Sequence, residues 1–189
     1  FSSRFPAVKV LIQEDNGAGV ARRVKTAEVD FGISGVYEED AELVFKPLVK
    51  DGFGVVCRSD HVLAQKRGSI SWAELDGHRY IRSARDSSVH AMLSRVAGDL
   101  AFFNSPAFEA SNLAGTESLL AEGLGFAILS SIGATHHAGK KFVFRPLVRP
   151  TAYREVCLIT RQNRALSPAA QAMVASCEIA MRQMTLPAG

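Results

Sequence analysis

Apolar and polar positions follow regular periods along most of the chain, and these periods predict its elements. Val8–Gln13 alternates apolar and mixed positions, which predicts a strand with one apolar face. Asn16 offers a cap for a helix whose apolar side chains recur at helical spacing from Val20 to Ala27. Asp30–Ser34 is predicted as the next strand. Strand, helix and strand together have the size of a βαβ unit, whose strands run parallel.

The same order of elements returns in the second half of the chain. Ala107–Ser111 predicts a strand, and Asn112 is placed to cap a helix that continues to Ala121. Gly123 ends that helix, and Gly125–Ser130 predicts another strand. Each half of the chain therefore contains a strand, an asparagine cap, a helix and a second strand.

Further elements complete an alternating β and α order. A turn at residues 50–52 is predicted between two further strands, Leu43–Leu48 and Gly54–Arg58. One helix follows Ser87–Ser88, and a closing helix begins at Ser167–Pro168. The additional strands are predicted over Leu43–Leu48, Gly54–Arg58, Arg79–Arg82, Phe142–Val148 and Tyr153–Thr160.

This order favours an α/β protein made of two small lobes. Parallel sheets bind ligands outside the carboxyl ends of their strands. Two such sheets that face each other would form a cleft, and closure of the lobes would hold a small molecule there.

Composition excludes several classes of protein. The net charge of +3 over 189 residues does not indicate a nucleic-acid or membrane surface. No apolar run reaches the roughly 20 residues that span a bilayer, so no membrane partner is expected. Phe1–Pro6 looks like the tail of a helix stopped by proline, so a segment is expected to precede it.

Metal and cofactor chemistry finds no support in the motifs. The cysteine count of 3 is odd and includes no C-x-x-C pair, which suits a reducing cytoplasm. The adjacent His136 and His137 would point in different directions on a helix, so no metal site is expected. Gly123 and Gly125 follow a helix, unlike a dinucleotide fingerprint. We therefore predict no cofactor and no metal.

Basic residues concentrate between Gly139 and Arg164, with Glu155 as their acidic neighbour in sequence. Two interpretations stay open for them, a solvated strand face or the anion-attracting rim of a cleft. The residues are Lys140, Lys141, Arg145, Arg149, Arg154, Arg161 and Arg164.

Small polar residues at the predicted strand ends are the candidates for ligand binding. Ser34–Gly35 offers a hydroxyl and a close backbone approach, although an ordinary turn has the same pattern. The connection Ser83–Ser88 would combine free helical N–H groups with Arg85 to hold a carboxylate, unless Arg85 is only solvated. Ser111–Asn112 opens the next helix in the same way, where capping is expected and ligand contact is an alternative.

An enzyme is the less favoured interpretation. The sequence contains no G-x-S-x-G elbow, H-E-x-x-H motif or P-loop. Asp60–His61 could act as a catalytic pair, but an exposed capped turn explains the two residues more simply.

Several motifs, in order, resemble the effector-binding domain of LysR-type bacterial transcription regulators. Two positions depart from the pattern of that family: His61-Val62 stands for the usual His-Pro, and Ser130-Ser131 for a proline after the strand. The matching motifs are Phe5-Pro6-x-Val8, Val24 with Glu28–Ile33, Pro47-Leu48, Cys57-Arg58-x-Asp60-His61-x-Leu63-Ala64, Leu119–Leu129 and Arg164-x-Leu166-Ser167-Pro168-Ala169-Ala170.

The resemblance implies two Rossmann-like lobes like those of type 2 periplasmic binding proteins, with a cleft between them. Residues 1–80 and 150–189 would form the first lobe and residues 81–149 the second. On this resemblance, the family's first strand and helix, and its N-terminal winged helix-turn-helix, would be missing from this chain. DNA would then be bound only through that missing domain.

The resemblance also implies a function, a site and partners. The chain would be a cytoplasmic sensor of a small-molecule effector, such as an organic acid, within a homodimer or homotetramer. Strand Val8–Gln13 and helix Val89–Ala97 would be dimer surfaces. An extracytoplasmic solute-binding protein of the same architecture is the alternative. By position, the effector contacts would be Ser34, Gly35, Ser83, Ala84, Arg85, Ser111, Asn112, Phe126 and Ala127.

Overall fold

The computed structural model describes residues 1–36, 38, 40–83, 88–135 and 141–184. The chain forms two compact units. Unit 1 comprises Phe1–Lys50 and the chain from Glu155 through the C-terminal helix, and unit 2 comprises Asp51–Arg154. Two strands, β2 (Leu43–Arg58) and β8 (Tyr153–Arg161), pass from one unit into the other.

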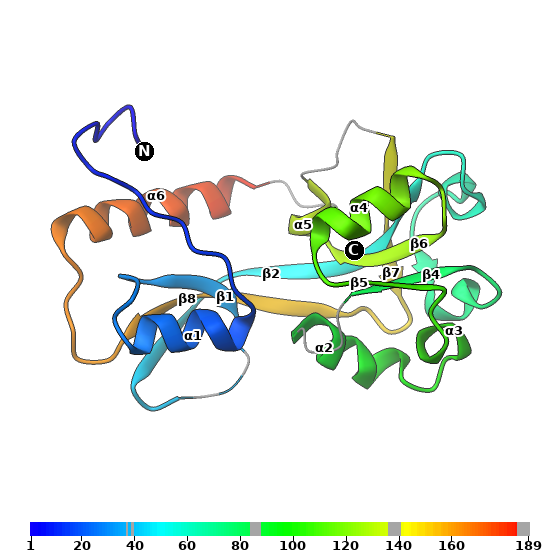
Figure 1. Ribbon diagram of the computed structural model, residues 1–189, viewed down its shortest axis with the longest axis horizontal. Helices are drawn as coiled ribbons and strands as arrows, with labels where there is room; N and C mark the ends of the chain where they lie inside the picture. The colour runs from blue at the N-terminus through cyan, green and yellow to red at the C-terminus, as the bar shows by residue number, and fades with distance from the viewer. Residues whose placement is uncertain (37, 39, 84–87, 136–140, 185–189) are drawn as a thin grey trace. The chain divides into compact units, whose positions relative to one another are not determined.

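Unit 1 is an antiparallel sheet with helices. β1 (Gly32–Gly35) pairs with β8, with Gly32 opposite Ile159, and β8 neighbours β2 in turn. Helix α1 (Gly17–Lys25) packs on this sheet through the buried Val24, which belongs to one apolar cluster with Leu43 and Ile159. Figure 1 shows α1 and α6 (Pro168–Gln183) with the strands of this unit.

The strand predicted over Val8–Gln13 does not form. Its apolar side chains lie in solvent, with Leu11 73% and Ile12 81% exposed. Among the described residues, β1 pairs with β8 and with no second strand. Alternation therefore predicted the wrong structure here, because a strand needs a partner for its backbone groups and this segment has none.

The two strands predicted over Leu43–Leu48 and Gly54–Arg58 are one continuous strand, β2. The turn expected at residues 50–52 is wrong. Turns expose Asp and Gly to water, but the Asp51 side chain is 0% exposed and accepts hydrogen bonds from within unit 2. These bonds satisfy the carboxylate in place, so the strand continues through it.

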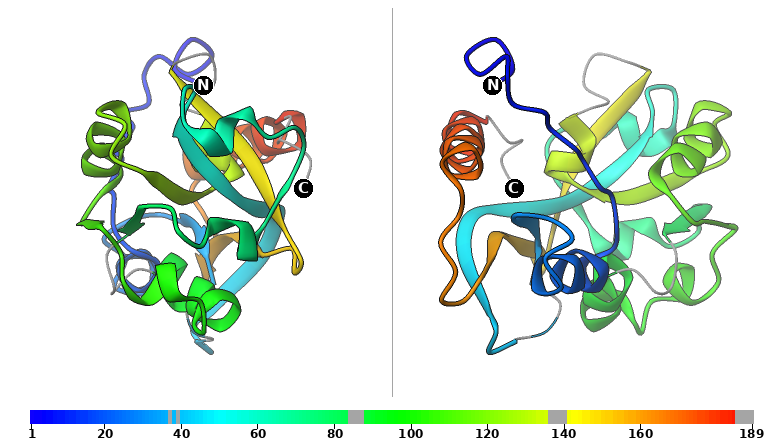
Figure 2. Two further views of the ribbon diagram at one scale, coloured as in Figure 1. Left: turned by 90° about the vertical axis from the view of Figure 1, so that its right-hand side faces the viewer. Right: turned by 60° about the vertical axis from the view of Figure 1, so that its left-hand side comes forward.

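Unit 2 has a mixed sheet between two layers of helices. β6 (Phe126–Ser130) and β7 (Phe142–Val148) both pair antiparallel with β2, whereas β4 (Tyr80–Ser83) runs parallel to β6 and to β5 (Phe108–Ala110). Figure 2 shows β7, in yellow, beside β2 in its left view. The parallel order predicted for the second half of the chain is confirmed.

Helices cover both faces of this sheet (Figure 1). One face carries α2 (Ser88–Ala97) and α3 (Ala101–Asn104) over an aromatic cluster, in which the ring centroid of Tyr80 lies 5.3 Å from that of Phe102 and 5.4 Å from that of Phe126. The other face carries α4 (Leu113–Ala121) and α5 (Ser131–Thr135), with Leu120 and Ala134 in the core. The remaining elements of unit 2 are η1 (Val62–Gln65), β3 (Ile70–Ser71) and η2 (Trp72–Leu75).

The boundary of the units lies at residue 50, earlier than the boundary expected near residue 80. The physical reason is the core of unit 2. Leu63, Trp72 and Leu75 are buried in the same apolar cluster as Phe126. Burial of these large side chains joins residues 51–80 to unit 2.

Candidate functional site

Three parallel strands of unit 2 end at one edge of its sheet. Ser83, the last residue of β4, lies opposite Ala110 of β5, and Ser111 follows directly. β6 runs the same way, with Ala127 opposite Ile81, and ends at Ser130. We call Ser83, Ser111–Asn112 and Ser130 the carboxyl edge of unit 2, the place where open α/β sheets bind ligands.

Asn112 caps helix α4, as predicted. Its backbone is extended and its Oδ1 accepts a hydrogen bond from the Gly115 N–H at 2.8 Å. The side-chain amide nitrogen has no hydrogen bond to any described residue, and both Ser111 and Asn112 are exposed. The cap therefore fixes the side chain while leaving its N–H donors available at the carboxyl edge.

The other predicted contacts fall in different places. Ser34 and Gly35 are the last two residues of β1 in unit 1, half-buried, where they pair with Cys157 and Val156 of β8. Ala84 and Arg85 lie outside the described residues, as do the neighbouring 86–87 and the histidines 136–137.

Phe126 and Ala127 were expected to line a wall of the site, but both side chains are buried in the core of unit 2. Phe126 is 0% exposed and packs on Tyr80 and Phe102. Ala127 packs on the opposite face, in the cluster of Leu120. Since β6 is the middle of a covered sheet, alternate residues point into the two cores, and these two residues support the site from within.

A buried polar network at this edge was not predicted from the sequence. The Asp51 Oδ1 accepts hydrogen bonds from the Ser131 hydroxyl and the Ile132 N–H, each at 2.9 Å. Its Oδ2 accepts from Nε of Arg154 at 2.9 Å, and Arg154 Nη2 donates to the Ser130 hydroxyl at 3.1 Å. The departure from proline at Ser130-Ser131 was the available signal, because both hydroxyls join this network.

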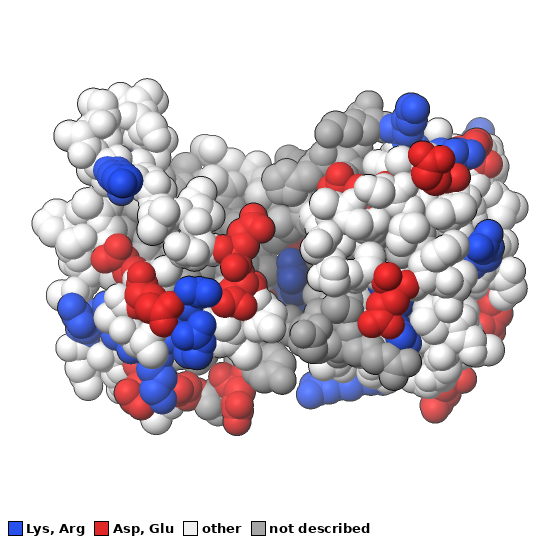
Figure 3. Space-filling view, in the orientation of Figure 1, with Lys and Arg blue, Asp and Glu red and all other residues white. Residues whose placement is uncertain are grey.

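Two arginines of the basic stretch are bound to backbone carbonyls. Arg145 donates from Nε and Nη2 to the carbonyls of Lys66 and Ala64, at 2.8 and 3.0 Å. Arg161 donates to the Val24 carbonyl at 2.6 Å. These arginines fasten loops and helix ends within their own units. On the face drawn in Figure 3, blue and red side chains stand next to each other over unit 1, as the α1 ion pairs require.

Residues 58–64, which we call the elbow, form a turn that is stabilised by its own side chains. Arg58 holds Asp60 with two hydrogen bonds of 2.7 Å, and this partner lowers the pKa of the Asp60 carboxyl. The His61 Nδ1 accepts from the Leu63 N–H at 3.2 Å and begins η1. The Asp60 carboxylate is thus bound to an arginine, which argues against a catalytic role with His61. Burial also raises the pKa of the nearby Cys57 thiol to about 11, which keeps it protonated.

His61 predicts a pH dependence of stability. Burial lowers the pKa of its imidazole below the usual 6.5, and the neighbouring His78 ring, 5.7 Å away, lowers it further. The His61 imidazole therefore binds a proton less readily in the folded state than in the unfolded chain. The stability that neutral His61 contributes to the folded state is therefore complete above the unfolded pKa and is lost as the pH falls through the folded pKa.

Urea unfolding of His61→Gln is expected to show a weaker loss of stability between pH 7.5 and 5.5 than urea unfolding of the unchanged chain. An identical slope in both proteins would assign the dependence to other groups.

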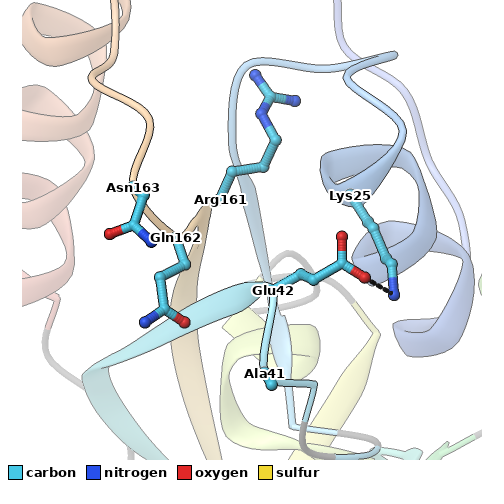
Figure 4. Close-up of a pocket in the computed structure, with 6 residues that line it drawn as sticks. All are labelled: Lys25, Ala41, Glu42, Arg161, Gln162 and Asn163. Carbon is cyan, nitrogen blue, oxygen red and sulfur yellow. Dashed lines mark ion pairs between the residues drawn. The ribbon is translucent and has the colours of Figure 1, made fainter.

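A hollow lies in unit 1, lined by Lys25, Ala41, Glu42, Arg161, Gln162 and Asn163 (Figure 4). Lys25 pairs with Glu42 at 2.7 Å, and Arg161 points away from that pair. The Arg161 Nη1 donates to the Val24 carbonyl, whereas its buried Nε has no hydrogen-bond partner among the described residues. In the described part of the chain, no group of three His, Cys, Asp or Glu side chains could hold a metal. No described helix is long and apolar enough to cross a membrane.

Comparison with known proteins gives the chain its relatives. Residues 1–182 match the family described as LysR substrate binding domain. A curated relative of Escherichia coli (strain K12), the uncharacterized HTH-type transcriptional regulator YbhD, is 30% identical over 90% of this chain and 54% of its own length. The chain spans about half the length of the curated relatives it matches.

Solved structures share the fold at low sequence identity. The CcmR regulatory domain of Synechocystis PCC6803, in complex with 2-PG, has a TM-score of 0.76 at 18% identity, covering 97% of this chain and 88% of that chain. The effector binding domain of QuiR, in complex with shikimate, has a TM-score of 0.71 at 19% identity, covering 91% of this chain and 81% of that chain. These similarities confirm the predicted α/β fold of the type 2 periplasmic binding proteins. With its family match over nearly the whole sequence, the chain belongs to the LysR substrate binding domain family.

Proposed function

We propose that this chain is the effector-sensing domain of a LysR-type transcription regulator and has no enzymatic activity. The observation that carries the proposal is the family match over residues 1–182, together with curated relatives that are named HTH-type transcriptional regulators. The elbow geometry supports a non-catalytic function, since Asp60 is bound to Arg58. A regulator of this kind would act in the cytoplasm and bind DNA through another domain.

The proposed site is the carboxyl edge of unit 2. Ser83, Ser111 and Asn112 would supply hydroxyl and amide donors, with Ala84 and Arg85 in the connection after β4. Ser34 and Gly35, the last residues of β1, stay predicted effector contacts. An organic acid suits these donors, and the QuiR domain was solved with shikimate, itself an organic acid.

Signal transmission would follow from unequal binding to two states of the domain. An effector shifts such an equilibrium only by the difference between its affinities for the states. β2 and β8 pass from unit 1 into unit 2, and these strands would carry the change from one unit to the other. In a homodimer or homotetramer, the shift would alter DNA binding by the regulator as a whole.

The proposal predicts a specific effect of one substitution. A thermal-shift screen of small organic acids is expected to find a compound that raises the melting temperature of the chain. Asn112→Asp keeps the helix-capping oxygen, because carboxylates are good caps. It removes the amide donors and adds negative charge, so affinity for that acid should fall about tenfold or more in calorimetry.

Asn16→Asp is the matched control. Asn16 caps α1 with the same kind of bond, its Oδ1 accepting from the Gly19 N–H at 2.9 Å, but it belongs to unit 1 and is not among the proposed effector contacts. Affinity should be unchanged in this variant. Equal effects of the two substitutions would argue against the carboxyl edge, and turnover of a screened compound would contradict the non-enzymatic function.

A further inference from the structure

Arg154 is held by its neighbours in a way that leaves part of it available. Its Nε and Nη2 both lie 2.9 Å from Oδ2 of the fully buried Asp51. The Arg154 side chain itself is 30% exposed, and its Nη1 makes no hydrogen bond or ion pair with a described residue. A guanidinium fixed on one side and open on the other presents N–H donors in the plane that carboxylate and phosphate oxygens match.

The position of Arg154 joins it to the carboxyl edge of unit 2. Its Nη2 donates to the hydroxyl of Ser130, the last residue of β6. In the pairing of β2 with β6, Phe53 lies opposite Ser130, so Asp51 follows just beyond the end of β6. The ion pair therefore stands at the edge that also carries Ser83 and Ser111.

The hydrogen bonds of the network use only Nε and Nη2 of the Arg154 guanidinium. Asp51 is satisfied on Oδ1 by the Ser131 hydroxyl and the Ile132 N–H, and on Oδ2 by Arg154. The two serines take part in it through their hydroxyls, where the family pattern has a proline. A fixed, partly exposed arginine beside two buried hydroxyls is chemistry that attracts an anion.

We infer that Arg154 is the anion-binding residue of the carboxyl edge, and that the effector carries a carboxylate or phosphate group that pairs with its Nη1 side. The inference rests on the proposed function and adds the residue that would hold the acidic group of the ligand. Asp51 is then a positioning residue. It orients the guanidinium, and its negative charge offsets part of the attraction that Arg154 exerts on the ligand.

Two substitutions in the same ion pair separate this role from a structural one. Arg154→Gln removes the anion partner and is expected to weaken anion binding about tenfold or more. Asp51→Asn keeps the acceptor for Ser131 and Ile132 and removes the negative charge that opposes an anion, so anion affinity should fall much less than in Arg154→Gln. A purely structural pair predicts the same loss in both variants, because each breaks the same interaction.

The probes are charged compounds with neutral counterparts: benzoate with benzamide, shikimate with its methyl ester, and inorganic phosphate alone, each titrated by calorimetry. We expect binding of at least one anion and none by its neutral counterpart. Arg95→Gln, which removes an equally charged exposed side chain from α2 of the same unit, should leave affinity unchanged. Fluorescence of the buried Trp72 checks that each variant is folded.

The double variant Asp51→Asn/Arg154→Gln decides the question if Arg154→Gln alone does not fold. It replaces the ion pair with two neutral amides and should bind no anion. The inference is overturned if no anion binds, if Arg154→Gln binds as tightly as Arg95→Gln, or if Asp51→Asn and Arg154→Gln lose equal affinity. Binding of neutral compounds alone would overturn the ligand class and leave effector sensing standing, whereas absence of any ligand in the wider screen would count against both.

Discussion

Gly125→Ala is expected to destabilise unit 2 by about 2–5 kcal/mol. Gly125 has a φ of 157°, and a Cβ atom there would lie 2.1 Å from the carbonyl oxygen of Arg79. That oxygen cannot easily move, since it accepts a hydrogen bond of 2.9 Å from the Phe126 N–H. The substitution thus strains the entry of β6, the central strand that ends at the carboxyl edge.

Urea unfolding followed by Trp72 fluorescence measures this loss directly. Trp72 is the single tryptophan of the chain and is buried in unit 2. Two other glycines of the unit are controls. At Gly68, with a φ of 76°, an added Cβ meets nothing within 4 Å, so only backbone strain of about 1–2 kcal/mol is expected. At Gly52 an added Cβ also meets nothing within 4 Å, and Gly52→Ala should change stability by less than about 1 kcal/mol. A cost for Gly125→Ala no larger than for Gly68→Ala would show that the contact with Arg79 relaxes.

Phe126→Ala is the second large effect and tests the corrected role of this residue. Its ring centroid lies 5.4 Å from Tyr80 and 5.7 Å from Phe102, and its side chain is 0% exposed. Removing the ring leaves a cavity among these aromatic groups, so the free energy of unfolding should fall by about 3–5 kcal/mol. Val62→Ala, at an exposed site of the same unit, should cost less than about 0.5 kcal/mol.

Phe126→Leu distinguishes core packing from effector contact. Leucine fills most of the space, so the variant should fold and bind an effector from the screen with unchanged affinity. A clear loss of affinity with little loss of stability would return Phe126 to the wall of the site. This comparison is informative because Phe126 was predicted to line the wall of the site only from its position in the family pattern.

Local signals carried most of the successful predictions. Asn16, Asn112 and Ser167 each cap a helix through the N–H three residues later, and such a bond depends only on neighbouring residues. Gly123 ends α4 with a φ of 69°, a conformation that glycine adopts without strain. Capping and helix ends are therefore readable from a short window of sequence.

Strand predictions failed where pairing decided the outcome. Val8–Gln13 has the alternation of a strand, yet forms no ladder in the structure. Residues 50–52 have the composition of a turn, yet lie inside β2. A strand is stabilised by the chain beside it, and the identity of that neighbour is set by residues far away in sequence.

The candidate site shows the same division. Ser83, Ser111 and Asn112 were predicted because small polar residues stand at strand ends, and the parallel register of β4 with β5 and β6 brings the ends of these strands to one edge. The Asp51–Arg154 pair was not recognised, since its two members are separated by 103 residues in sequence. Nothing local to either residue indicates the other.

By itself, the sequence determined the family, the α/β order and the helix caps of this protein, because motifs, periods and capping bonds are properties of short segments. Only the tertiary structure decided that β2 is continuous, that Phe126 belongs to the core, and that Arg154 stands at the carboxyl edge of unit 2. Each of these depends on burial and on partners distant in sequence. Burial in the folded chain turns Asp51 from a turn residue into the acceptor that positions Arg154.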